Sequence, residues 1–198
     1  MSRRLHTITL RIQLRSPYLV HGTDPGRFGL DATQFIDHLG RPVLPGTLVA
    51  GRVAEIWRDH HAALGGASPG TWFGSEGIDD GSGQHRARLL VRDLVLQTPH
   101  HRAESHGMDA SRIRQDDDTG AVRTGHLLLI EQFNLPGQLL DFQGDWLAWA
   151  DSGEIDTLVN QLRAALLLQT QLGAYRGVGF GRTRLVTVSA APATLGAP

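Results

Sequence analysis

Hydrophobic and polar residues alternate most regularly near the start of the chain. In HTITLRIQLR at 6–15, aliphatic side chains occupy every second position from Ile8 to Leu14, and polar side chains occupy the positions between. A period of two predicts a half-buried strand. Strand-like patterns recur at 86–97 and 125–135, and a closing strand is expected within GFGRTRLVTVSA at 179–190.

Two segments show the longer period of an amphipathic helix. The first spans about 47–64, with Gly65 as its expected stop. The second spans about 152–172, with Gly173 at its end. Asp151 and Glu154 have the spacing of a capping box, which predicts the start of the second helix.

Between these elements lie segments with turn-forming composition. Residues 21–42 are rich in glycine, aspartate and proline and are expected to be a loop, and residues 65–84 have a turn-forming composition and are expected to be an exposed loop. Residues 99–124 are polar, show no core periodicity, and predict a projecting insertion. The small and Pro-containing tail at 190–198 is expected to be frayed.

The order of elements is strand, helix, strand, insertion, strand, helix, strand. It predicts an α+β fold of the RRM-like (ferredoxin-like) type, in which helices cover one face of an antiparallel sheet. The expected domain comprises 1–98 and 125–189, interrupted by the insertion at 99–124. First and last strands are neighbours in this topology.

Charge is distributed unevenly along the 198 residues, although the net charge is only -1. Residues 1–23 and 157–198 carry eight arginines and no acid, whereas the segment between them carries eleven arginines and all 20 acidic residues. If the two ends meet in the fold, they form a basic surface suited to a phosphate backbone. Every basic residue apart from histidine is arginine, as a GC-rich genome would also produce.

Composition excludes several classes of protein. The chain has no cysteine, so disulfides and thiolate metal sites are ruled out. No apolar run approaches the roughly 18 residues of a membrane span, and the N-terminus lacks the apolar core of a signal peptide. We expect a cytoplasmic protein without a membrane partner.

Four segments carry motifs in a fixed order: GRFGLDATQFIDHLGRPVLPGTLVAG at 26–51, WFG at 72–74 followed by RARLLVRD at 86–93, SRIRQDDDTGAVRTGHLLLIEQF at 111–133, and LGAYRGVGFGRTRL at 172–185. In this order they resemble the RAMP (repeat-associated mysterious protein) superfamily, whose backbone subunits build type III CRISPR effector complexes. The similarity extends over about residues 20–186. It implies an RNA-binding subunit with a thumb at 99–124.

Two glycine-containing motifs suit a phosphate ligand on physical grounds as well. Pro45, Gly46 and Thr47 stand at the mouth of the first helix, where free backbone N–H groups and the helix dipole favour an anion. The alternative is an ordinary helix start capped by Thr47. In the last motif, glycine lets the backbone approach RNA closely beside arginine, although a plain turn has the same pattern. The residues concerned are Arg176, Gly177, Gly179, Gly181 and Arg182.

The chain departs from the family at the first helix. The family has Ser-Ser-Leu-Lys where this chain has Thr47-Leu48-Val49-Ala50, so a hydroxyl and a lysine are missing. Arg52 is the expected substitute for the lysine. In the thumb, Met108 or Ile113 is expected to act as a wedge between bases, and Arg112 and Arg114 to reach phosphates. A simple acidic loop around Asp116–Asp118 is the alternative.

Asp31 matches the loop aspartate that catalytic family members need to cut target RNA. The implied reaction is attack of a 2′-hydroxyl on the adjacent phosphate, aided by a carboxylate and by Mg²⁺. Asp24, Asp37 or an inactive subunit remain alternatives. His21 is either a partner of Asp31 or a solvated loop residue, and Glu131 either pairs with an arginine or lies near RNA.

The resemblance therefore implies a subunit that binds guide CRISPR RNA, pairs with target RNA and assembles with copies of itself or other effector subunits. Whether it is an endoribonuclease that cuts the target at regular spacing or a non-catalytic scaffold stays open. An unrelated RRM-like RNA-binding domain is a third hypothesis. It predicts aromatic platforms on the central strands, and 6–15 and 86–97 contain none.

Overall fold

The structure is a computed structural model that describes residues 2–15, 17–22, 30–64, 68–74, 86–98, 108–115, 122–133, 137 and 139–193. Its main sheet is antiparallel and has the strand order β2-β4-β7-β1-β8, with β3 also paired to β7. The strands are β1 (Arg4–Arg15), β2 (Val43–Leu44), β3 (Leu89–Leu90), β4 (Leu94–Leu96), β7 (Leu139–Ala150) and β8 (Arg182–Pro192). The mixed α+β architecture agrees with the expected RRM-like fold.

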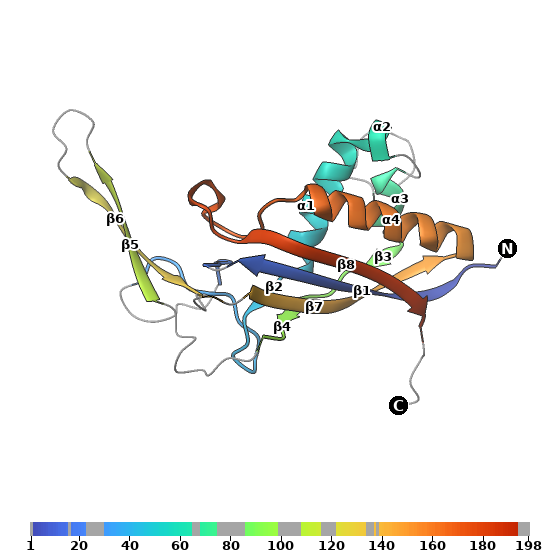
Figure 1. Cartoon of the computed structure of the whole chain (residues 1–198), viewed down its shortest axis with the longest axis horizontal. Coiled ribbons are helices and arrows are strands. Elements are labelled where there is room, and N and C mark those ends of the chain that lie inside the picture. Colours follow the sequence, from blue (N-terminus) through green and yellow to red (C-terminus); the bar gives the residue numbers. More distant parts are fainter. Residues whose placement is uncertain are drawn as a thin grey trace.

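Helices cover one face of this sheet (Figure 1). They are α1 (Gly46–Asp59), α2 (His61–Leu64), α3 (Pro69–Phe73) and α4 (Ser152–Leu168). The core between the two layers contains inward side chains of β1, such as Ile8 and Leu10, together with Trp57 of α1 and Leu162 of α4. None of the described helices has the length and hydropathy of a membrane span.

The first and last strands are neighbours, as predicted. β1 pairs with β8 over His6–Arg15, and its other edge pairs with β7. The pairing extends to Pro192, so residues 190–192 belong to the sheet and their expected fraying was wrong. A bulge at Gln13/Leu14 shifts the register, and Arg15 then stands opposite Arg182.

The longest strand that the sequence analysis missed is β7 of the main sheet. β7 places Leu140, Phe142, Trp146 and Ala148 on the buried face, but Gly144 interrupts this apolar series. A Cβ at Gly144 would lie 2.5 Å from the carbonyl oxygen of Asp93, so the glycine serves close packing of the backbone.

The strand expected at 125–135 exists as β6 (Val122–Gln132), but it does not join the main sheet. It pairs with β5 (Met108–Gln115) in a separate two-stranded hairpin. Figure 1 shows this hairpin extending away from one end of the main sheet. The tip between Gln115 and Val122 and the residues before Met108 lie outside the described residues.

Both predicted helices exist with different bounds. The first is divided at His60 into α1 and α2. The second begins with the predicted capping box, in which the Asp151 carboxylate accepts from the Glu154 N–H (2.9 Å). It ends at Leu168, four residues before the predicted end, because the chain turns at Gln169 to bring Gln171 against Arg182.

Candidate nucleic-acid interface

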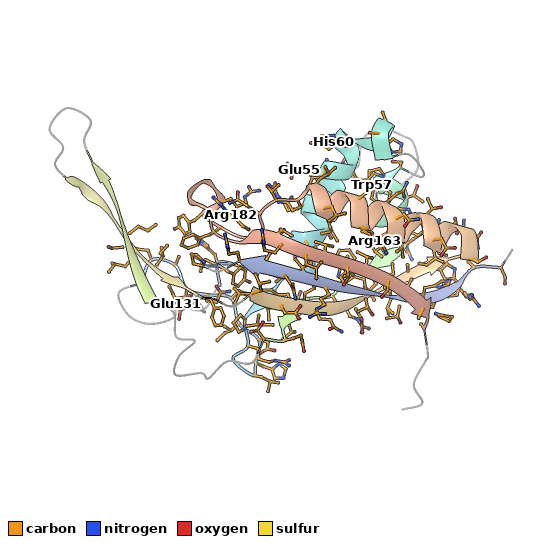
Figure 2. The ribbon with its side chains drawn as sticks, in the orientation of Figure 1. Glu55, Trp57, His60, Glu131, Arg163 and Arg182 are labelled. Atoms are coloured by element: carbon orange, nitrogen blue, oxygen red, sulfur yellow. The ribbon has the colours of Figure 1, made fainter. Side chains whose placement is uncertain are left out.

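A small second core joins segments that are far apart in the sequence. It lies where the segment after β1, β6, the loop at 30–36 and the glycine-rich loop at 172–181 meet. It consists of Leu19, Ala32, Ile130 and Phe180, packed against Leu128, Ala174 and Tyr175 (Figure 1). The motifs that begin at 26, 111 and 172 therefore meet at one end of the molecule. Figure 2 shows Glu131 and Arg182 at this same end.

The glycine-rich loop has a specific backbone conformation. Gly173, Gly179 and Gly181 all have positive φ, and a Cβ at Gly181 would overlap the carbonyl oxygen of Leu172. Gly181 also accepts a hydrogen bond from the Leu172 N–H (2.9 Å), which closes the base of the loop. Gly177 differs, because a Cβ there would meet no atom within 4 Å. The space above Gly177 is open.

Two connected concavities lie along this loop. One, of about 510 Å³, is lined by Gln169, Thr170, Gln171, Gly173, Ala174, Tyr175, Arg176 and Gly177. The other, of about 340 Å³, is lined by Arg15, Thr170, Gln171, Arg182, Thr183 and Arg184. Because both contain Thr170 and Gln171, we describe them as one surface and call it the arginine groove. No acidic residue is among the described residues that line it.

The four arginines of the groove come from both ends of the chain: Arg15 from the end of β1, and Arg176, Arg182 and Arg184 from the last motif. Within the described part of the chain, none of the four forms an ion pair. Arg15 and Arg182 stand directly opposite each other in the ladder. Like charges in that position are destabilising, so the arrangement favours an anionic ligand.

Other arginines from the acid-free ends are already engaged. Arg11 donates from Nε to Asp141 of β7 (2.8 Å), and Arg3 lies 3.4 Å from Glu154. Arg163 of α4 donates to the carbonyl oxygen of Val188 (2.8 Å; Figure 2). The predicted basic surface is therefore smaller than the acid-free segments implied.

Asp31 lies in the loop against the base of β6. Its N–H donates to the carbonyl oxygen of Leu129 (2.8 Å), and its Oδ2 accepts from the Leu129 N–H (2.7 Å). The side chain is exposed, and its Oδ1 has no partner among the described residues. One carboxylate oxygen is thus available to a ligand.

The two alternative catalytic aspartates, Asp24 and Asp37, differ from Asp31 in their surroundings or in whether the structure describes them. Asp24 lies outside the described residues. Asp37 accepts from the N–H of Leu39, from the N–H of Arg41 and from the Arg41 guanidinium. Burial acts to raise the pKa of Asp37, but the hydrogen bonds from Arg41 and Leu39 outweigh it and lower the pKa. Its carboxylate is thus engaged in holding its own turn.

The mouth of α1 is occupied from within the protein. The Gly46 N–H donates to the Asp93 carboxylate (2.8 Å), and the helix follows Pro45 with no side-chain cap, so Thr47 does not cap it. Gly46 is required there because a Cβ would overlap the backbone of Arg92. Arg52 lies 2.5 Å from Glu55. Pro45, Thr47 and Arg52 do not line the groove.

Four residues expected in the thumb belong to β5: Met108, Arg112, Ile113 and Arg114. The structure describes their backbone but not the positions of their side chains. Glu131 accepts from the Gln34 N–H (3.0 Å). His21 is exposed, and its ring lies 5.9 Å from that of Tyr175. The sequence analysis did not single out most of the groove residues as binding residues, namely Arg15, Gln169, Thr170, Gln171, Gly173, Ala174, Tyr175, Thr183 and Arg184.

The open face of the sheet is the surface that the unrelated-RRM hypothesis would use. On it, Asp141 holds Arg11, and Asp145 accepts from the Thr9 hydroxyl (2.7 Å). Trp149 of β7 is 50% exposed, so an aromatic residue does stand on a strand that the sequence analysis missed. Two carboxylates beside the central strand make this face a poor surface for phosphates.

No protein-family model and no curated protein matches the sequence. Among solved structures, a chain in the cryo-EM structure of the type III-B Cmr-β complex bound to cognate target RNA has a similar fold, with a TM-score of 0.64 and 13% sequence identity. The similarity covers 93% of this chain and 61% of that one, so this chain spans about three-fifths of its neighbour's length. The shared feature is the fold, a mixed α+β domain with an antiparallel sheet.

Proposed function

We propose that this chain is an RNA-binding subunit of a type III CRISPR effector complex. The observation that carries the proposal is the arginine groove, in which four arginines without ion-pair partners in the described chain meet beside a glycine-rich loop. The similar fold in the RNA-bound type III-B complex and the ordered motifs support the same assignment. The ligand we assign to the groove is the ribose-phosphate backbone of the guide CRISPR RNA.

The chemistry of the groove fits a single strand of RNA. Arginine presents a planar fork of N–H donors that matches two phosphate oxygens. Glycine at 177 leaves room for the backbone of a ligand to approach. Thr170 and Gln171 line both concavities and so lie between the two arginine-bearing parts of the groove, and the side-chain amide of Gln171 donates to the Arg176 carbonyl oxygen (2.8 Å).

The test compares two triple variants with the same change in charge. In Arg15→Ala/Arg182→Ala/Arg184→Ala, the groove loses three arginines. In the control Arg4→Ala/Arg86→Ala/Arg92→Ala, three exposed arginines outside the groove are removed. Binding of a fluorescent single-stranded RNA is measured as a function of salt. Each lost phosphate contact reduces the slope of log K against log salt by about 0.7 for a single strand, so the groove variant should lose about 2.

The control triple should keep nearly the wild-type slope. Equal losses in both variants would show that binding follows overall charge and would refute a specific groove. Circular dichroism melts of both variants verify that each is folded.

We further propose that Asp31 takes part in cleavage of paired target RNA. Its exposed Oδ1 is available, while its Oδ2 holds the loop to Leu129. In the proposed step the carboxylate takes the proton of a 2′-hydroxyl. The 2′-oxygen then bonds to the adjacent phosphorus, the P–O5′ bond breaks, and the leaving oxygen takes a proton from water.

The implied Mg²⁺ fits this site only in part. Magnesium prefers six oxygen ligands, and the described residues contain no group of three or more His, Asp or Glu side chains that could hold it. Asp31 contributes one oxygen, so the other ligands would be phosphate oxygens and water. We therefore assign the described residues no magnesium site of their own.

Asp31→Asn is the sharpest test of cleavage. The asparagine amide oxygen still accepts from the Leu129 N–H, but the side chain cannot take a proton. Assembled complex carrying this variant should bind target RNA as before and leave it intact in the presence of Mg²⁺. If wild-type complex also leaves the target intact, the scaffold function is correct and this subunit has no nuclease activity.

A further inference from the structure

Tyr175 has an unusual backbone conformation in the groove. Its φ of 53° and ψ of 34° place it in the left-handed region, and among the described residues it is the only non-glycine residue with positive φ. This conformation is unfavourable for a residue with a Cβ, and it persists only where the surroundings hold it. A glycine at this position would adopt the same conformation without that cost, so the tyrosine needs its own explanation.

The surroundings of the Tyr175 ring hold it at the wall of the larger concavity. The ring centroid lies 5.9 Å from that of His21 and 5.9 Å from that of Phe180, the latter at an edge-on angle of 69°. Phe180 is buried, whereas the Tyr175 side chain is only partly buried. Tyr175 thus packs against the small second core and also lines the concavity together with Arg176 and Gly177.

We infer that this concavity binds one nucleobase, which stacks on the Tyr175 ring while the arginines hold the adjoining phosphates. The inference rests on the proposed RNA-binding function and adds the base-binding part of the site. An aromatic ring beside a charged groove is the usual arrangement for single-stranded nucleic acids, and stacking tolerates every base because each has a π-face. The left-handed conformation of Tyr175 places the ring at this wall in the same turn that presents Arg176.

The experiment separates base contacts from phosphate contacts with two probes. One is a single-stranded oligoribonucleotide, and the other is an abasic ribose-phosphate oligomer of the same length. Tyr175→Phe keeps the ring. Tyr175→Gly removes the ring at a position whose φ suits glycine, and Tyr175→Asn is a second ring-free variant whose side chain tolerates the left-handed region.

Loss of one base–aromatic stack corresponds to about a 5- to 150-fold weaker affinity. We expect that loss for Tyr175→Gly and Tyr175→Asn with the oligoribonucleotide, no change with the abasic oligomer, and wild-type binding of both probes by Tyr175→Phe. An equal loss for both probes would assign the ring a purely structural role and overturn the inference. Unchanged binding of the oligoribonucleotide by the folded ring-free variants would overturn it as well.

The two proposals fail in different ways. If the wild-type chain bound neither probe, the RNA-binding function would be refuted and the base site with it. If the wild-type chain bound both probes equally well, the groove would bind phosphates and the base site alone would be refuted.

Discussion

The two ends of the main sheet use arginine in opposite ways. At the end near the start of β1, Arg88 donates to both carboxylate oxygens of Glu154 (3.0 and 2.7 Å) and to the Trp149 carbonyl, and it lies 4.4 Å from the centroid of the Trp72 ring. Arg3 adds a further contact to Glu154. We call these residues the Glu154 cluster. At the other end, the arginine groove has the same type of side chain and no acid among its described residues.

This difference indicates that the arginines of the Glu154 cluster stabilise the fold and that those of the groove bind a ligand. In the Glu154 cluster the protein supplies the counter-charge, so the guanidinium group stabilises the start of α4 and its contact with β7. In the groove none of the described lining residues supplies a counter-charge, and two arginines oppose each other across the ladder. Substitutions in the cluster should therefore affect folding, and substitutions in the groove should affect ligand binding.

The largest expected effect on stability is at the glycine-rich loop, which contributes both to the fold and to the arginine groove. Gly181→Ala introduces a Cβ that overlaps the Leu172 carbonyl oxygen at a φ of 61°, so we expect a loss of about 3 kcal/mol in the free energy of unfolding and weaker RNA binding. Gly177→Ala is the matched control, because its Cβ would lie in open space and stability should hardly change. Urea denaturation measures both, and equal stability of the two variants would contradict the loop geometry.

Removal of Arg88 should have the next largest effect on the free energy of unfolding. Arg88→Ala leaves the Glu154 carboxylate and the Trp149 carbonyl without their main donor, at an expected cost of about 2 kcal/mol in the free energy of unfolding. RNA affinity of the folded fraction should remain at the wild-type value. A loss of affinity without a loss of stability would show that the two ends of the sheet are not separate in function.

The Glu154 cluster also predicts a pH dependence of stability. Hydrogen bonds from Arg88, and then from the Asp151 N–H and Arg3, lower the pKa of Glu154 to about 2 against partial burial. A carboxyl whose pKa is lowered on folding contributes stability that is present above its unfolded pKa and is lost as the pH falls toward 2. We expect about 1 kcal/mol to be lost by pH 3, after allowance for solvent screening. Glu154→Gln should remove this dependence in urea titrations at pH 7 and pH 3.

The smallest effect belongs to the groove and has the opposite sign. Arg182→Ala removes one of two opposed arginines that lack ion-pair partners in the described chain. The free energy of unfolding should therefore rise by about 0.5 kcal/mol or stay unchanged. The gain should shrink in high salt, because salt screens the repulsion between exposed charges. A destabilised Arg182→Ala variant would mean that the guanidinium makes a structural contact.

Local patterns predicted local structure well. The alternation of β1, the capping box of α4 and the turn before β8 all depend on neighbouring residues, and all three are present. β7 was missed because Gly144 breaks its apolar series, and the reason for that glycine is the Asp93 backbone, which is distant in the sequence. The pairing of β6 with β5 was missed because a run of apolar residues predicts a strand but does not predict which other strand it pairs with.

The candidate site was predictable to a similar extent. The acid-free ends indicated that arginines of the first and last segments would meet, and β1 and β8 do pair. Which arginines remain available depended on β7 and α4, since Asp141 and Glu154 engage Arg11 and Arg3. The phosphate site expected at Gly46 depended in the same way on Asp93, which the sequence does not connect with it.

The order of residues along the chain was thus sufficient for the helices, most strands and the excess of arginine at both ends, since these depend on short-range periodicity and composition. Only the tertiary structure decided which charges neutralise each other, which strand stands third in the sheet, and that the Tyr175 ring lies at the wall of a groove. These properties depend on contacts between residues that are far apart in the sequence, and no local pattern determines such contacts.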